Sequence, residues 1–376
     1  MDCGTLAVIT VKFLAKTAPN QDPALWSSLI PGGGDRIEDV KFTFDLDARD
    51  YDWLVVYEGL PPLDGEKKTN RVERLACPRA NTLLITTEPS SIRIDGPQFL
   101  RQFGHVLTHK HPDLVRHSGQ IRRTPPLRWF YGRPRGGPGR YMTWDDMEEA
   151  APTKNNYLST VCSTKQMSHT VHAKRLEFVL ALRDRLPEMD VFGRGIQPID
   201  EKSEAMDTYR YHIAIENHVE AGHWTEKLAD CFLAGCLPFY FGDPNYASAF
   251  PAESVIPIDI FDLDKAEAVI RDAIATHQYE KRLPFIMEAR RRVLHDYNIL
   301  SVVADIATAK NKQAPIIAGA EICGRHIFRR KHPFQAVQDA LFRARIARHP
   351  ATSPSKVKLP HYARRNGNNL SLFTGI

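Results

Sequence analysis

The alternation of strand-like and helix-like segments in the second half of the chain constrains the fold more than any other feature. Short runs rich in β-branched and aromatic residues follow one another, separated by longer amphipathic runs. The strand candidates are residues 156–163, 189–195, 209–217, 237–242 and 255–259, and the helix candidates are residues 170–186, 224–236 and 264–277. A succession of this kind predicts a doubly wound, mainly parallel sheet.

A looser alternation occupies the first half of the chain. Its strand candidates are residues 5–13, 40–47, 51–59, 82–89 and 105–110. Residues 67–76 are predicted to form a helix between the third and fourth of these strands, which favours a second, largely parallel sheet. Residues 131–140, "YGRPRGGPGR", are interpreted as a loop, because no Gly-Lys-Ser/Thr of a phosphate-binding loop follows the glycines.

The length of the chain, 376 residues, exceeds one ordinary hydrophobic core and fits two domains. We therefore expect an α/β fold in which two Rossmann-like domains face a cleft. The first domain would comprise residues 1–150 and the second residues 151–320, with a basic C-terminal helix and tail at 321–376.

Positive charge gathers near the end of the sequence. From Gly324 to Asn366 the only acidic residue is Asp339. Such a segment could contact anionic lipid, nucleic acid or an anionic substrate, or it could be a solvated helix followed by a tail. No apolar stretch is long enough to span a bilayer, and the first residues resemble a strand more than a signal peptide, so we expect a cytoplasmic protein. Six scattered cysteines predict reduced, mostly buried thiols.

The stretch from 215 to 243 concentrates polar residues around the start of an apolar helix. Glu216 and Asn217 end a strand, Thr225 is a candidate N-cap, and Glu226 and Lys227 begin the helix. A helix N-terminus favours an anion such as a diphosphate, and Lys227 adds a cation. Glu226 needs neutral donors such as sugar hydroxyls. Together these residues indicate a nucleotide-sugar site, although Thr-Glu at a helix start is also ordinary capping chemistry.

Three further side chains could reach the same cleft. Lys174 and Arg175 lie on the helix at 170–186, where they could bind the ligand or form the polar face of the helix. Glu88 follows a buried strand, just before Pro89, and could remove a proton from an attacking hydroxyl. The alternative for Glu88 is an exposed loop glutamate.

Histidine pairs are the only hint of metal ligands in the sequence. His169 and His172 could share a helix face, and His109 and His111 form a His-x-His. Neither pair has an evident third ligand, so we expect no metal site.

The second half of the chain resembles the α-1,3/α-1,4-fucosyltransferase family, glycosyltransferase family 10. The likeness covers about residues 155–260 and runs through "AKRLEFVLALRDRLPEMDVFGRG", "YRYHIAIEN" and "WTEKLADCFLAGCLPFYFGDPNY". The corresponding family patterns are an Arg-rich helix, a D-x-x-G-x-G strand end, F-E-N, T-E-K and A-G-x-x-P-x-x-x-G-x-x-x-Y. In the first half the likeness rests mainly on "TTEPSS", which stands where the family has E-S-P.

The resemblance implies a two-Rossmann glycosyltransferase of the GT-B type that inverts the anomeric carbon of fucose. The donor would be GDP-fucose, bound in the second domain, and the acceptor a glycan or glycolipid, bound in the first. No metal or other cofactor would be required. Carried over by position, Glu88 would be the general base. Among the donor-binding residues, Arg175 and Lys227 would bind the diphosphate, Glu226 would bind hydroxyls, and Glu216 and Asn217 would order the pocket. His223 would also bind the donor; with Trp224 it precedes T-E-K, where the family often has an aromatic residue.

Two other functions remain open from the sequence. One is a retaining transferase that uses another nucleotide-sugar such as GDP-mannose, but Glu216 and Glu226 are separated by nine residues, unlike the paired glutamates typical of those enzymes. The other is a non-catalytic sugar-nucleotide or membrane-binding protein that works through residues 324–366. We expect this segment to rest on the inner face of an anionic membrane, and we expect no nucleic-acid partner.

Overall fold

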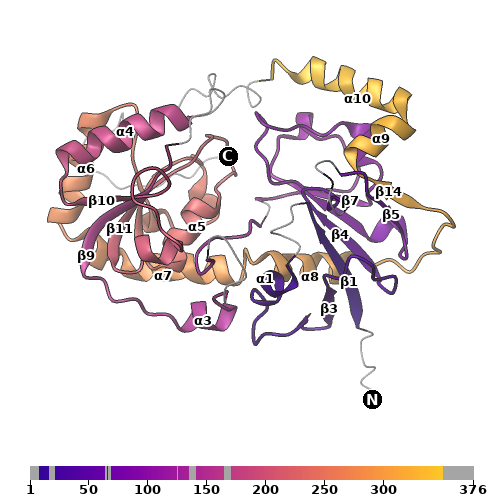
Figure 1. Ribbon diagram of the computed structural model, residues 1–376, viewed down its shortest axis with the longest axis horizontal. Coiled ribbons are helices and arrows are strands. Elements are labelled where there is room, and N and C mark those ends of the chain that lie inside the picture. The colour runs from indigo at the N-terminus through magenta and orange to yellow at the C-terminus, as the bar shows by residue number, and fades with distance from the viewer. Residues whose placement is uncertain are drawn as a thin grey trace.

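Two mainly parallel sheets, one in each half of the chain, organise the molecule into two lobes (Figure 1). The computed structural model describes residues 8–16, 22–63, 66, 69–124, 126–134, 141–164 and 171–349. The sheets confirm the expected α/β class. Five cysteines (Cys77, Cys162, Cys231, Cys236 and Cys323) are buried free thiols, as predicted, and Cys3 lies outside the described residues.

The first sheet has seven strands in the order β2-β3-β1-β4-β6-β7-β8. Only β2 and β3 pair in antiparallel fashion. The strands are β1 Ile9–Ala15, β2 Arg36–Ile37, β3 Val40–Thr43, β4 Trp53–Tyr57, β6 Thr82–Ile85, β7 His105–Thr108 and β8 Gln120–Arg122. β4 and β6 are buried along their whole length, because a parallel sheet covered on both faces leaves no solvent-facing side.

The predicted helix at 67–76 is wrong. Within that range the structure has β5, Val72–Arg74, which pairs in antiparallel fashion with β14, Glu321–Cys323. The hydrogen-bond partner of β5 therefore comes from the far end of the chain. Glu73 is turned inward to form an ion pair of 2.7 Å with the buried Lys12. This distant pairing leaves no mark on the local sequence pattern.

The second sheet is entirely parallel, in the order β10-β9-β11-β12-β13. Its strands are β9 Asn156–Val161, β10 Met189–Phe192, β11 Tyr209–Ile215, β12 Leu237–Phe241 and β13 Ile256–Pro257. The predicted strands and helices of this half all form. The helices of the molecule are α1 Pro23–Ser27, α2 Pro97–Leu100, α3 Trp144–Glu149, α4 His172–Arg185, α5 Glu226–Leu233, α6 Leu263–Ala275, α7 Gln278–Leu294, α8 Ile299–Lys310, α9 Arg325–Lys331 and α10 Pro333–Ile346.

After α7 the chain returns to the first lobe (Figure 1). α8 packs against β1, β2 and β3, and α10 packs against α2 and α9. The ring of Phe328 on α9 lies 5.6 Å from that of Phe99 on α2. α8, which lies within residues 151–320, thus packs on the first sheet. The described residues contain no helix that is both long and apolar enough to cross a membrane.

Candidate functional site

Two adjoining cavities, of about 910 and 480 Å³, lie at the carboxyl edges of the two sheets. The larger spreads over the second sheet and reaches Arg175, Arg194 and Lys202. The smaller reaches the turns after β4 and β6 of the first sheet. The cavities share Arg128, Phe130, His172, Asn217, Glu226 and Lys227. Both halves of the chain thus contribute to one site.

The start of α5 is organised by a buried carboxylate. Thr225 is the N-cap, and its hydroxyl accepts from the backbone N–H of Lys227 at 3.3 Å. Glu216, only 1% exposed, accepts from the Thr225 backbone N–H at 2.8 Å and from its hydroxyl at 2.6 Å. A carboxylate of the protein itself therefore lies at the start of this helix and fixes its N-cap residue.

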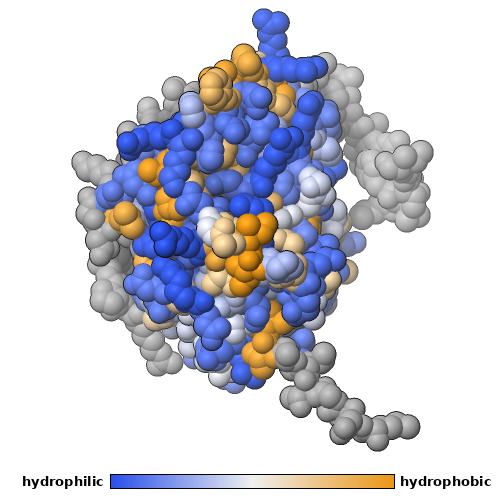
Figure 2. Space-filling model, turned by 90° about the vertical axis from the view of Figure 1, so that its right-hand side faces the viewer, coloured by the Kyte–Doolittle hydropathy of each residue, from blue (hydrophilic) through white to orange (hydrophobic). Residues whose placement is uncertain are grey.

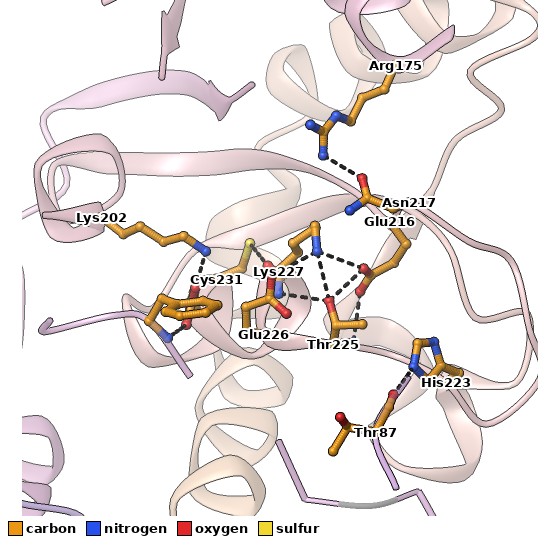
Figure 3. Close-up of polar contacts among 12 residues, drawn as sticks. Thr87, Arg175, Lys202, Glu216, Asn217, His223, Thr225, Glu226, Lys227 and Cys231 are labelled. Atoms are coloured by element: carbon orange, nitrogen blue, oxygen red, sulfur yellow. Dashed lines mark hydrogen bonds and ion pairs between the residues drawn. The ribbon is translucent and has the colours of Figure 1, made fainter. Parts of the chain in front are cut away.

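Lys227 lies between two carboxylates (Figure 3). Its Nζ is 2.8 Å from Glu226 and 3.3 Å from Glu216. Burial alone would lower the pKa of Lys227 and raise that of Glu226, but their attraction reverses both effects. The pKa of Lys227 is raised, and Lys227 together with Lys202 lowers the pKa of Glu226 to about 2. Burial raises the pKa of Glu216, against the opposing charge of Lys227.

Arg175 faces the larger cavity from α4. One Nη donates to the side-chain oxygen of Asn217 at 2.9 Å, as Figure 3 shows, while Nε is buried with no hydrogen-bond partner among the described residues. Asn217 is itself held, because its backbone oxygen accepts from Val171 at 3.3 Å. Asn217 therefore orients the guanidinium group of Arg175, whose Nε–H remains available to donate a hydrogen bond to a ligand.

His223 points away from this cluster toward the first lobe (Figure 3). Its Nε2 is 2.9 Å from the carbonyl oxygen of Thr87, and its ring lies 4.3 Å from that of His109. Burial, followed by the charge of His109, lowers the pKa of His223 to about 3. His223 lines only the smaller cavity, so it meets the turn after β6 rather than Arg175 or Lys202.

Glu88 lies on that turn and lines the smaller cavity. No hydrogen bond or ion pair to the described residues occupies its carboxylate, whereas Glu58, on the neighbouring turn, accepts from the hydroxyl of Thr87. Ser90, two residues further, donates to Glu220 of the second lobe. The contact of Glu220 with Ser90 could not be predicted from the sequence, because no local pattern links residues 130 positions apart.

Three cations of the site were also not predicted. Arg128 lines both cavities, lies over the ring of Phe130 at 4.7 Å, and has a buried Nη1 without a partner among the described residues. Burial, followed by the charge of Arg133, lowers its pKa to about 10. Lys202 pairs with Asp230 at 2.5 Å, and Arg194 is exposed at the cavity edge. The glycine turn "FGRG" was the only sequence signal for Arg194.

The two histidine pairs of the sequence, His169 with His172 and His109 with His111, do not come together at one site among the described residues. His172 lines both cavities, and His169 lies outside the described residues. His109 is 3.5 Å from Glu220. His111, Asp113 and His349 offer atoms within 4.8 Å of one another at the surface, a group that the sequence spacing does not reveal.

Comparison with known proteins supports one family for the second lobe. Residues 151–278 match the family "Glycosyltransferase family 10 (fucosyltransferase) C-term". The chain is also 29% identical over 69 residues to the alpha-(1,3)-fucosyltransferase FucT of Helicobacter pylori. That alignment covers 18% of this chain and 14% of the relative, so the chain spans only a small part of this relative's length.

Solved structures with a similar course of the chain are glycosyltransferases at low identity. An α1,3-fucosyltransferase crystallised with GDP-fucose is 14% identical, with a TM-score of 0.43, 83% of this chain covered and 95% of that one. WaaG, a glycosyltransferase involved in lipopolysaccharide biosynthesis, is 12% identical, with a TM-score of 0.40 and coverage of 81% and 100%. The family match itself contains Arg175, Glu216, Asn217, Glu226 and Lys227. The second lobe, with the cluster around the start of α5, thus matches the C-terminal part of family 10 glycosyltransferases, the fucosyltransferases, over residues 151–278.

Proposed function

We propose that this chain is an inverting fucosyltransferase that moves L-fucose from GDP-fucose to a hydroxyl group of a glycan, in an α-1,3-type linkage. One observation carries the proposal. Among the described residues, Nε of Arg175 and Nη1 of Arg128 are buried without hydrogen-bond partners at one cavity, in a lobe that matches a fucosyltransferase family. Buried polar atoms left unpaired are costly, so two such guanidinium groups call for an anionic ligand. The diphosphate of a nucleotide-sugar meets that need.

The donor would then lie along the larger cavity. Arg175 and Arg128 bind the diphosphate, with Lys227 as a third cation beside them. Glu226 stays ionised, because its pKa is held at about 2, and accepts hydrogen bonds from hydroxyls of the ribose or the fucose. Glu216 and Asn217 keep Thr225 and Arg175 in position. His223 contributes to the smaller cavity rather than to the diphosphate site.

The reaction follows from the smaller cavity. The oxygen of an acceptor hydroxyl attacks C1 of fucose from the side opposite the diphosphate, and the C1–O bond breaks with its electron pair going to GDP. Glu88 takes the proton of the hydroxyl. Glu88 suits this role better than Glu58, because the Glu58 carboxylate is engaged by Thr87 and that of Glu88 is not. The arginines stabilise the departing GDP electrostatically, so the proposal requires no metal or other cofactor.

The acceptor would bind to the first lobe and be a glycan or glycolipid. α10 supports a place for the enzyme on the inner face of an anionic membrane. Its outer face exposes Phe334, Val337 and Leu341 (83%, 59% and 65% exposed), with Arg345 and Arg348 further along the helix and its end. Figure 2 shows apolar side chains among strongly hydrophilic ones at the top of this face, where α10 lies. Apolar and basic residues on one helix are typical of interfacial helices.

The experiment that tests the function is a GDP-release assay with GDP-fucose, GDP-mannose and a panel of glycan acceptors. We expect acceptor-dependent release from GDP-fucose. Glu88→Gln should abolish transfer while donor binding is retained, and Glu58→Gln should retain most of it. Transfer at the normal rate by Glu88→Gln would refute the base assignment. Faster transfer from GDP-mannose would refute the donor, and donor binding without any turnover would favour a non-catalytic protein.

A further inference from the structure

A second group of cations lies on the first lobe, away from the donor cavity. Two adjoining cavities of about 310 and 430 Å³ are bordered by the first lobe's carboxyl-edge turns and by α9, and Arg93 and Arg325 line both. We call these two cavities the arginine groove. Its cationic side chains are those of Lys16, Arg93, Arg325, Arg329 and Arg343.

Two of these arginines form a fixed frame. Asp95, 8% exposed, accepts from Nε of Arg93 at 3.3 Å and from Nε and Nη2 of Arg325 at 2.7 and 3.1 Å. Both guanidinium groups also donate to the carbonyl oxygen of Glu58, at 2.7 Å from Arg93 and 3.1 Å from Arg325. One carboxylate thus serves two guanidinium groups, which leaves the frame positively charged.

The remaining cations of the groove have no such partners. Among the described residues, Lys16, Arg329 and Arg343 form no hydrogen bond or ion pair through their side chains. The second acid of the groove is Asp339. Its carboxylate accepts hydrogen bonds from two backbone N–H groups at the start of α2, at 2.8 and 3.0 Å. Five cationic side chains therefore face two carboxylates, and both carboxylates are already in use. A cavity of this charge attracts an anion.

The arginine groove adjoins the candidate active site. Ile92, 40% exposed, lines both the groove and the smaller cavity that contains Glu88. Glu58 also connects the groove with the smaller cavity. It lines the smaller cavity, and its carbonyl oxygen accepts hydrogen bonds from Arg93 and Arg325 of the groove. An oligosaccharide that leaves the Glu88 turn along the first lobe passes Ile92 and reaches Arg329.

We propose that the arginine groove binds a carboxylate or phosphate group of the acceptor, one or more sugar units away from the hydroxyl that receives fucose. This inference rests on the proposed transferase function and adds the acceptor class to it. Arg93 and Arg325 stay bound to Asp95 and shape the site. Arg329 and Arg343 supply free guanidinium donors, which suit planar carboxylates and phosphates through paired hydrogen bonds. The preferred acceptor is therefore an acidic glycan.

Arg329→Glu tests the proposal in the full-length protein, with Lys281→Glu as its matched control. Both residues are exposed on helices, have no ion-pair partner among the described residues, and undergo the same charge reversal. The probes are an oligosaccharide ending in galactose and N-acetylglucosamine, and the same oligosaccharide carrying one uronic acid. We expect a lower KM for the acidic acceptor, a rise of that KM by about tenfold in Arg329→Glu, and unchanged KM values for the neutral acceptor and for GDP-fucose. Equal effects on both acceptors, or none, would overturn the proposal.

Calorimetric binding of the acidic oligosaccharide in the absence of donor separates this proposal from the proposed function. Binding that weakens in Arg329→Glu but not in Lys281→Glu supports the groove even if no fucose is transferred. Fucose transfer without any preference for the acidic acceptor refutes the groove and leaves the transferase intact. The last measurement is binding of the wild type and of Arg329→Glu to vesicles with and without phosphatidylglycerol. If Arg329→Glu loses vesicle binding but not oligosaccharide binding, the anion is a lipid headgroup and the acceptor assignment is wrong.

Discussion

Glu220 of the second lobe holds Ser90 of the first. One carboxylate oxygen accepts from the Ser90 hydroxyl at 2.5 Å, and the other accepts from the Ser90 backbone N–H at 2.8 Å. Burial alone would raise the pKa of Glu220, but the adjacent His109 and the hydrogen bonds from Ser90 lower it to about 2. Because Ser90 follows Glu88 by two residues, an acid from one lobe fixes the turn that carries the proposed base on the other.

Glu220→Gln should therefore impair catalysis without affecting the donor. A glutamine can accept only one of the two hydrogen bonds, so the Glu88 turn loses part of its anchor, and we expect kcat to fall about tenfold. The KM for GDP-fucose should stay unchanged. Steady-state kinetics with Ser90→Ala and the double variant completes the measurement. Effects of the two single variants that simply add in the double would show that the pair does not act as a unit.

Lys227→Met should weaken donor binding and leave two carboxylates facing each other without their shared cation. We expect the KM for GDP-fucose to rise on the order of tenfold, since a charge-assisted contact to the diphosphate is lost. Lys174→Met serves as the control, because Lys174 pairs with Glu177 on the polar face of α4. A donor KM that changes equally in both variants would count against a diphosphate contact of Lys227.

Asp230 is a structural acid between the lobes, and its removal should destabilise the protein. It is fully buried, accepts from the backbone N–H groups of Phe130 and Tyr131 at 2.9 and 3.0 Å, and pairs with Lys202. Asp230→Ala leaves a cation and two N–H groups unpaired, so we expect a loss of about 3–5 kcal/mol in the free energy of unfolding. Urea denaturation measures this loss. Asp184→Ala, at an exposed position of α4, should cost less than about 0.5 kcal/mol.

His212 should make stability depend on pH in mild acid. It is 3% exposed beside Ser159 at 2.8 Å, and burial lowers its pKa to about 3, whereas the unfolded chain binds a proton near pH 6.5. The stability it contributes is complete above pH 6.5 and is lost as pH falls toward 3, with about 1 kcal/mol gone by pH 5.5. Unfolding midpoints between pH 7.5 and 5.5 should change less in His212→Gln. An identical slope in both proteins would contradict the assignment.

The outer face of α10 should govern vesicle binding. Replacing Phe334, Val337 and Leu341 together by serine removes the apolar stripe, and we expect sedimentation with phosphatidylglycerol vesicles to fall to background. Ile316 and Ile317, 51% and 69% exposed elsewhere on the first lobe, provide the matched control for lost surface apolarity. Binding by the wild type should also weaken as salt is raised. Equal loss in the control variant would show that α10 has no special part.

The second sheet could be predicted from the sequence because each of its elements carries its own signal. β11 reads as a strand, Thr225 as an N-cap and α5 as a buried helix, and the parallel topology then brings the ends of these elements to one edge. The expectation that Glu216, Asn217 and Lys227 lie at one edge agrees with their places around the smaller cavity. What local patterns could not show is that the buried carboxylate of Glu216 holds Thr225, the N-cap of α5, through two hydrogen bonds.

The contacts between the lobes could not be predicted, because they depend on pairs of residues far apart in the chain. Glu220 meets Ser90 over 130 positions, and β5 finds its partner strand near residue 322. Arg128 sits in a segment without secondary structure, where no periodicity marks a side chain as buried. Each of these residues carries a signal only once both sheets are placed.

The return of the chain through α8, β14 and α9 means that the first lobe is not a contiguous folding unit. A fragment that stops near residue 150 would lack the helix that covers β1 and β3, and the strand that completes β5. Its apolar sheet face would meet water, so such a fragment should aggregate during synthesis until the later segments emerge. The fragment covering the second sheet, by contrast, has its own parallel sheet and helices within one stretch. Nascent chains should therefore complete the second lobe before the first, in the reverse of their order in the sequence.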